Sequence, residues 1–181
     1  MSPWDPQVSG WRPDFRPADE QFEGHAARLR ALVGRRLVEG WTVWIVDEDW
    51  FADLPVVMRF DDGSQLEVSW KKFDDLSLTW DTIDVNEPPS TWVDWPLEWR
   101  RNAHAPLAAL IGGAVREVRT TSFLFETWNA DNRSDRTAAW LTTGLWLATD
   151  RGDLHVFNAL DENGLAAEGF DRDASHDWRP I

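Results

Sequence analysis

Histidine is the side chain best suited to proton transfer or metal binding near neutral pH. The four histidines of this chain are widely separated, and none pairs with another at metal-ligand spacing or in a His-Glu-x-x-His motif: His25, His104, His155 and His176. The chain has no cysteine, which excludes thiolate catalysis, disulfides and cysteine-bound zinc. We therefore predict no metal site and no catalytic histidine, although His155 is notable because it lies on an expected strand.

Paired carboxylates are the second chemical possibility, as in glycoside hydrolysis. Asp61–Asp62 and Asp74–Asp75 are candidate pairs, but Asp61-Asp62-Gly63 is typical of a hairpin turn, and adjacent side chains there diverge. Residues 161–164, Asp-Glu-Asn-Gly, are faintly similar to a calcium loop but lack its alternating aspartates and closing glutamate. Phosphate-loop, dinucleotide and serine-hydrolase motifs are missing too. We expect a protein that is not an enzyme and needs no cofactor.

Acidic charge is concentrated in one part of the chain. The net charge is −14, and residues 47–94 carry 13 acidic residues against three basic ones. Such a field repels nucleic acid and anionic membranes and attracts basic proteins or cations. Solubility alone is the competing explanation, since acidic surfaces are common.

Tryptophan is the other unusual feature, with 14 copies and no tyrosine in the chain. Most tryptophans are expected in the core, and a few at the surface could anchor a partner. Acids and tryptophans occur together in three short stretches of the acidic segment. These stretches give the predicted partner-binding residues: Asp47, Glu48, Asp49, Trp50, Asp81, Asp84, Trp92 and Asp94.

Binding is thus the function that the sequence favours. Composition and size are similar to those of small acidic bacterial immunity proteins. Such a protein needs a negative patch that speeds association with a basic partner and buried aromatic side chains that slow dissociation. The first hypothesis is an immunity-type inhibitor of a basic, toxin-like protein, with no nucleic-acid or membrane partner. The alternatives are a Trp-lined pocket for a sugar or other small molecule, a structural homodimer, and an enzyme with scattered carboxylates. Without cysteine, a signal peptide or a long apolar run, the chain is expected in the cytoplasm.

A three-stranded antiparallel meander over residues 56–83 is expected to organise the chain. Leu66, Val68 and Trp70 alternate with polar residues, as in a strand with one buried face. Glu67 and Ser69 are therefore expected on a polar face exposed to water.

The flanking elements follow from periodicity and turn residues. Residues 1–18, rich in proline and tryptophan, are expected to lie on the domain as an arm that includes Trp4. The remaining expectations are helices over 19–33, 96–101 and 106–111, strands over 37–46 and 114–126, a flexible polar loop over 127–137, a hairpin of 138–149 with 153–159, and loop from 161 onward.

A weak internal repeat suggests how these elements combine. Leu29–Gly34 is echoed by Leu107–Gly112, and Phe60–Gly63 by Thr149–Gly152. A unit of one helix and a few strands cannot easily bury its own apolar face, so two copies should pack together. The prediction is an α+β fold of antiparallel sheets and a few short helices, in one compact domain. Its expected parts are an arm (1–18), a first helix-plus-meander unit (19–86), a linker with a Trp cluster (87–105) and a second helix-plus-hairpin unit (106–181).

Apolar residues at the inward positions of these elements form the predicted core. They are Phe22, Leu29, Leu32, Val43, Ile45, Val56, Met58, Phe60, Leu66, Val68, Trp70, Leu78, Phe123, Phe125, Leu145, Leu147, Leu154 and Val156.

Overall fold

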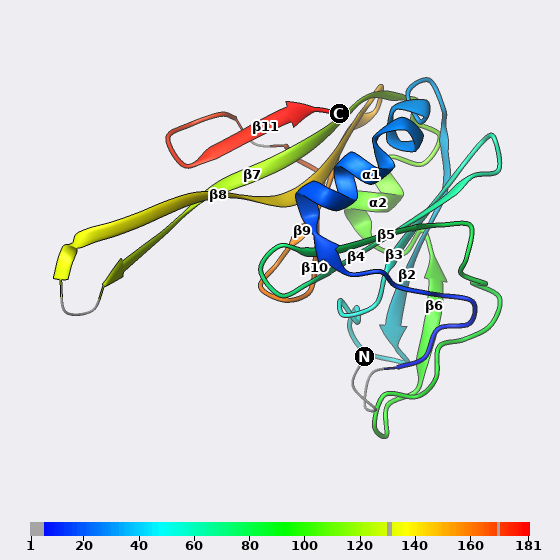
Figure 1. Cartoon of the computed structure of the whole chain (residues 1–181). Coiled ribbons are helices and arrows are strands. Elements are labelled where there is room, and N and C mark those ends of the chain that lie inside the picture. The colour runs from blue at the N-terminus through cyan, green and yellow to red at the C-terminus, as the bar shows by residue number, and fades with distance from the viewer. Residues whose placement is uncertain (1–5, 130–131, 170) are drawn as a thin grey trace.

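The computed structural model describes residues 6–129, 132–169 and 171–181, which form two antiparallel sheets and two helices (Figure 1). The elements are β1 (Arg16–Pro17), α1 (Ala18–Ala31), β2 (Leu37–Ile45), β3 (Val56–Phe60), β4 (Gln65–Lys71), β5 (Asp75–Trp80), β6 (Leu97–Arg101), α2 (Ala105–Ala109), β7 (Val115–Asn129), β8 (Asn132–Thr149), β9 (Gly152–Asn158), β10 (Asn163–Ala166) and β11 (His176–Pro180). The predicted fold of antiparallel sheets with few short helices is confirmed.

The first sheet contains the predicted meander and has the order β1-β5-β4-β3-β2-β6. Val68 pairs with Val56 on one side and with Leu78 on the other, so these apolar side chains share one face. The second sheet has the order β10-β9-β8-β7-β11. Its strands β7 and β8 form a long hairpin that extends away from the rest of the molecule (Figure 1).

The two sheets are joined at two matching turns. Gly34 follows α1 and Gly112 follows α2, with φ of 89° and 84°, a left-handed backbone that glycine adopts without strain. The Gly34 N–H donates to the Val115 carbonyl (2.9 Å), and the Gly112 N–H donates to the Leu37 carbonyl (2.6 Å). These hydrogen bonds hold the starts of β2 and β7 side by side.

The main core combines residues of both sheets with residues of α1 and α2. Helix α1 contributes Phe22 and Leu29, which lie two helical turns apart. Asp19 and Glu20 lie at the positive N-terminal end of α1. Met58 and Leu66 from the first sheet belong to the same cluster as residues of β7, β8 and β9 from the second. Most of the predicted core is confirmed. Ile45, at the end of β2, is only half-buried. On β7, Phe125 is half-buried and Phe123 is exposed, because they lie on the part of the β7–β8 hairpin beyond the end of β9.

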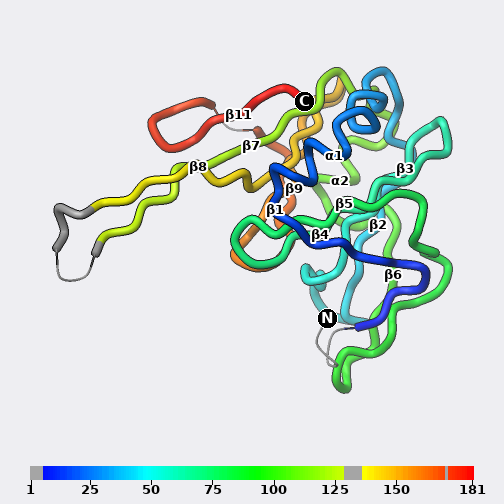
Figure 2. Tube along the Cα trace, in the orientation of Figure 1, coloured from blue at the N-terminus to red at the C-terminus, as the bar shows by residue number. Residues whose placement is uncertain are grey.

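A second apolar cluster covers the face of the first sheet that faces away from the main core. It joins Val43, Phe51 and Val57 with Val8 of the N-terminal segment and Val85 of the segment after β5. Figure 2 shows the N-terminal segment, in dark blue, crossing the first sheet. The prediction of a water-exposed polar face is therefore wrong. Its side chains lie under this layer, and the buried polar residues are Gln65, Glu67, Ser69 and Ser77.

Other elements also differ from the expectation. Residues 97–101 form strand β6, not a helix, because pairing with β2 satisfies their backbone groups. The described residues of the predicted loop 127–137 are instead the outer part of the β7–β8 hairpin, where Thr127 pairs with Thr137, and residues 130–131 lie outside the described part of the chain. The chain after residue 161 contains two edge strands that were not predicted, β10 and β11, and its other described residues form turns and loop as expected.

Candidate functional site

An acidic end of the first sheet, formed by residues 46–50 and 91–96, is the candidate site. β2 ends and β6 begins there, at the lower end of the molecule in Figure 1, with Ile45 paired to Leu97. The Val46 N–H donates to the Pro96 carbonyl (3.0 Å), so the two loops lie side by side. Neither loop contains a basic residue. Their four carboxylates are exposed and belong to Asp47, Glu48, Asp49 and Asp94.

A tight hairpin presents apolar side chains beside these acids. Trp92 and Trp95 exchange backbone hydrogen bonds of 2.9 and 2.8 Å, which leaves Val93 and Asp94 at the tip. Val93 has φ of 53°, a left-handed conformation that is a clear outlier for a β-branched residue. Val93 is 62% exposed and Trp95 is 45% exposed. Large apolar side chains within an acidic surface are the chemical features that a basic protein partner can use.

Two of the predicted anchors point inward. The Trp50 ring packs against the main core and meets the His104 ring at 4.5 Å, with its indole nitrogen buried and without a partner among the described residues. Trp92 is half-buried, and its ring lies 4.9 Å from Phe51 in the second cluster. Trp95 and Val93 are the outward residues instead. Sequence reasoning missed them because only the Trp92–Trp95 turn reveals their direction.

The predicted residues Asp81 and Asp84 lie elsewhere. Asp81 follows β5 at the opposite end of the sheet, where it pairs with Arg28 (2.7 Å) and accepts the Gln65 N–H (2.7 Å). Asp84 accepts the Asn86 N–H (3.0 Å) and lies in the segment that crosses the sheet. Both carboxylates make local contacts and are not brought together with Asp47 and Asp49.

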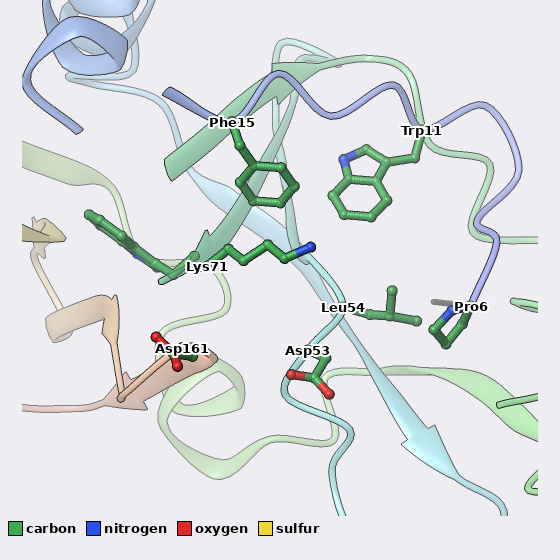
Figure 3. Close-up of a pocket in the computed structure, with 8 residues that line it drawn as sticks. Pro6, Trp11, Phe15, Asp53, Leu54, Lys71 and Asp161 are labelled. Atoms are coloured by element: carbon green, nitrogen blue, oxygen red, sulfur yellow. The ribbon is translucent and has the colours of Figure 1, made fainter. Parts of the chain in front are cut away.

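A small cleft between the N-terminal segment and the first sheet is lined in part by tryptophan (Figure 3). Its volume is about 150 Å³, and its walls include Trp11, Trp70 and the carboxylates of Asp53 and Asp161. Lys71 extends beneath Phe15, with its ammonium nitrogen 5.6 Å from the ring centre. The cleft is small beside the ~300–1,000 Å³ of typical ligand pockets. It therefore gives little support to a Trp-lined sugar site.

The His, Asp and Glu side chains of the described residues do not assemble into a metal centre. No group of three or more His, Asp or Glu side chains could hold a metal ion in this part of the chain. Burial lowers the pKa of His104 and, with Arg28 nearby, that of His25. In the same described residues, neither helix is long and apolar enough to cross a membrane.

No protein-family model matches the chain, and neither a curated protein nor a solved structure matches it significantly.

Proposed function

We propose that this chain is a protein-binding module whose acidic end docks a basic protein, in the manner of an immunity-type inhibitor. The observation that supports this function best is that residues 46–50 and 91–96 adjoin, so that the exposed Asp47, Asp49 and Asp94 share two neighbouring loops with the exposed Trp95. Such a surface attracts a basic partner over a distance and holds it through a desolvated aromatic group. The lack of cysteine agrees with action in a reducing compartment such as the cytoplasm.

We also infer that the module consists of two tandem units. The strand order β5-β4-β3-β2-β6 of the first sheet corresponds to β10-β9-β8-β7-β11 of the second. Irregular pairing occurs between Leu37 and Glu39 in β2, and between Val115 and Glu117 at the equivalent place in β7. In this arrangement each unit covers the apolar face of the other, so the chain does not need a second copy to complete its main core.

Charge reversal tests the docking surface directly. Asp47→Lys with Asp49→Lys should lower the free energy of unfolding by no more than about 1 kcal/mol, because both sites are exposed but Asp47 has φ of 64°, a backbone conformation that aspartate adopts more readily than lysine. A basic protein captured from the native host lysate at low salt should bind this variant about ten-fold more slowly or worse. Trp95→Ala should mainly accelerate dissociation, with a loss of about 2 kcal/mol if the ring is an anchor.

A matched control separates a local effect from net charge. Glu23→Lys with Glu168→Lys changes the net charge equally at exposed positions outside the two loops, and should have less effect on association. Association rates that are unchanged in the Asp47 and Asp49 variant at low salt would contradict the proposal. The acidic charge would then serve solubility alone.

A further inference from the structure

An apolar groove on the second sheet lies outside the proposed docking surface. Its volume is about 680 Å³, within the ~300–1,000 Å³ range of small-molecule pockets. The walls come from β7, β8 and β9, from the turn between β4 and β5, and from the loop between β9 and β10. The apolar side chains that line it are mainly Phe73, Phe123, Phe125, Leu141, Phe157 and Leu160.

The rim of the groove exposes apolar side chains on an unfavourable backbone. Phe73 is 68% exposed with φ of 47°, and Leu160 is 94% exposed with φ of 61°. Left-handed backbone costs a non-glycine residue free energy, and such strain is concentrated at functional sites. Asn158 connects the two rim loops, since its side chain donates to the Phe73 carbonyl and accepts the Asp161 N–H (3.0 Å).

The floor of the groove is closely packed and holds a buried histidine. His155 stacks on Phe157 with ring centres 4.9 Å apart, and its Nε2 lies 2.8 Å from the Thr121 hydroxyl. Gly144 allows this contact, because a Cβ there would collide with both Thr121 and His155. Gly164 likewise leaves room for the Phe157 ring. The aromatic floor is therefore set by packing, as in a largely pre-formed site.

The charges around the groove restrict what it can bind. Among the described residues that line it there is no lysine or arginine, and Asp161 is an exposed carboxylate at the edge. His176 pairs with Asp173, at 3.1 Å between Nδ1 and Oδ1. The chain as a whole carries −14, so an anionic ligand would be repelled without a compensating cation.

We infer that this groove binds an uncharged, largely apolar small molecule, with aromatic or alkyl groups seated among the phenylalanines. The hollow shape supports a small molecule rather than a second copy of the chain, because a flat protein surface would leave much of the volume unfilled. Burying such a ligand removes the exposed faces of Phe73, Phe123 and Leu160 from water. This site is independent of the acidic end and does not rest on the proposed docking function.

A pair of fluorescent probes tests the inference. N-phenyl-1-naphthylamine is uncharged, and 8-anilino-1-naphthalenesulfonate has the same rings with an added sulfonate. We expect saturable one-to-one binding of the uncharged probe, and at least about ten-fold weaker binding of the sulfonate. Ala166→Trp should fill the groove and weaken the uncharged probe about ten-fold or more, whereas Val38→Trp adds the same ring at an exposed site outside the groove and should not.

Further measurements keep the result interpretable. If Ala166→Trp fails to fold, Phe73→Ser replaces it, because that exposed side chain tolerates a polar group and should also weaken the probe. Non-saturable binding, equal binding of the two probes, or binding unaffected by the groove variants would overturn the inference. A dimer detected by light scattering would also overturn it, if Phe73→Ser dissociates the dimer and the probe binds only after dissociation. A second copy of the chain would then be the natural occupant of the groove.

Discussion

His155 is a buried base whose protonation state is linked to folding. Burial lowers the pKa of His155 from 6.5 to about 4. The unfolded chain binds a proton there below pH 6.5, whereas the folded chain does so only below about pH 4. The free energy of unfolding should therefore fall by about 3 kcal/mol as the pH drops from 6.5 to 4.

Urea unfolding of the wild type and of His155→Gln across this range measures the contribution. The variant should lose part of the pH dependence. His25 and His104, together with carboxylates whose pKa values are lowered, such as Glu39 and Asp173, should account for the remainder. Equal slopes in the two proteins would show that His155 is not the titrating group.

Val93 carries backbone strain that glycine would remove. Its positive φ in a two-residue hairpin is a position where glycine is strongly preferred. Val93→Gly should raise the free energy of unfolding by about 1 kcal/mol, at the low end of the usual cost of such strain. Thermal or urea unfolding measures it, with Val38→Gly as the control. That residue is also an exposed valine but lies within β2, so its replacement should destabilise. A loss of stability in Val93→Gly would show that the valine is not strained.

At the scale of elements, the burial of Glu67 determines how the chain crosses the first sheet. Its carboxylate accepts the Thr82 N–H (2.7 Å) and the Ile83 N–H (2.8 Å), and it is also bonded by the side chains of Gln65, Thr79 and Thr82. Because β5 ends nearby, these bonds turn the following segment back over the sheet. A carboxylate that accepts hydrogen bonds from this many donors has a structural role, which is to fix the position of the segment after β5.

Glu67→Gln should destabilise the fold by about 2–4 kcal/mol, because an amide leaves some of these donors facing another donor. Ser69→Ala is the matched control on the same face. The buried Ser69 hydroxyl has no partner among the described residues, so its loss should cost less than about 0.5 kcal/mol. Similar losses in the two variants, measured by urea unfolding, would argue against the anchoring role.

The elements that sequence predicts are those with strong local signals. Alternation and a turn at Asp62–Gly63 are enough to predict β3, β4 and β5, and helical spacing with Gly34 predicts α1. β6 escapes prediction because its identity depends on pairing with β2, more than 50 residues earlier. The buried polar face escapes for the same reason, since only the fold places Val8 and Val85 above Glu67. Of the candidate site, charge alone predicts the acidic loops, but not the outward direction of Trp95.

At the scale of the whole molecule, the N-terminal segment belongs to the second apolar cluster. Val8 is buried there, the Ser90 N–H donates to the Gln7 carbonyl (2.8 Å), and the Asp84 N–H donates to the Ser9 carbonyl (3.2 Å). Deletion of residues 1–10 should leave the sheets folded but lower the free energy of unfolding by about 2 kcal/mol, from the loss of buried apolar area. Trp4, also expected to pack, lies outside the described residues. Urea unfolding measures the free energy of unfolding of the truncated chain and of Val8→Ala, and the loss in Val8→Ala should be about half of that in the truncated chain. An unchanged midpoint after truncation would refute this contribution.

The β7–β8 hairpin has a consequence for motion. β11 pairs with β7 as far as Phe123, and the Leu124 N–H still donates to the Ser175 carbonyl (2.8 Å) just before β11. β9 pairs with β8 only as far as Gly144, so beyond Leu124 the described strand residues pair only within the hairpin. A two-stranded ribbon is marginally stable in water by itself, whereas its base is held in a five-stranded sheet. Amide protection should therefore decline from base to tip, and the ribbon can fray without unfolding the domain. Phe125 belongs to this ribbon and also lines the groove. A ligand bound in the groove should therefore reduce the fraying of the ribbon near Phe125.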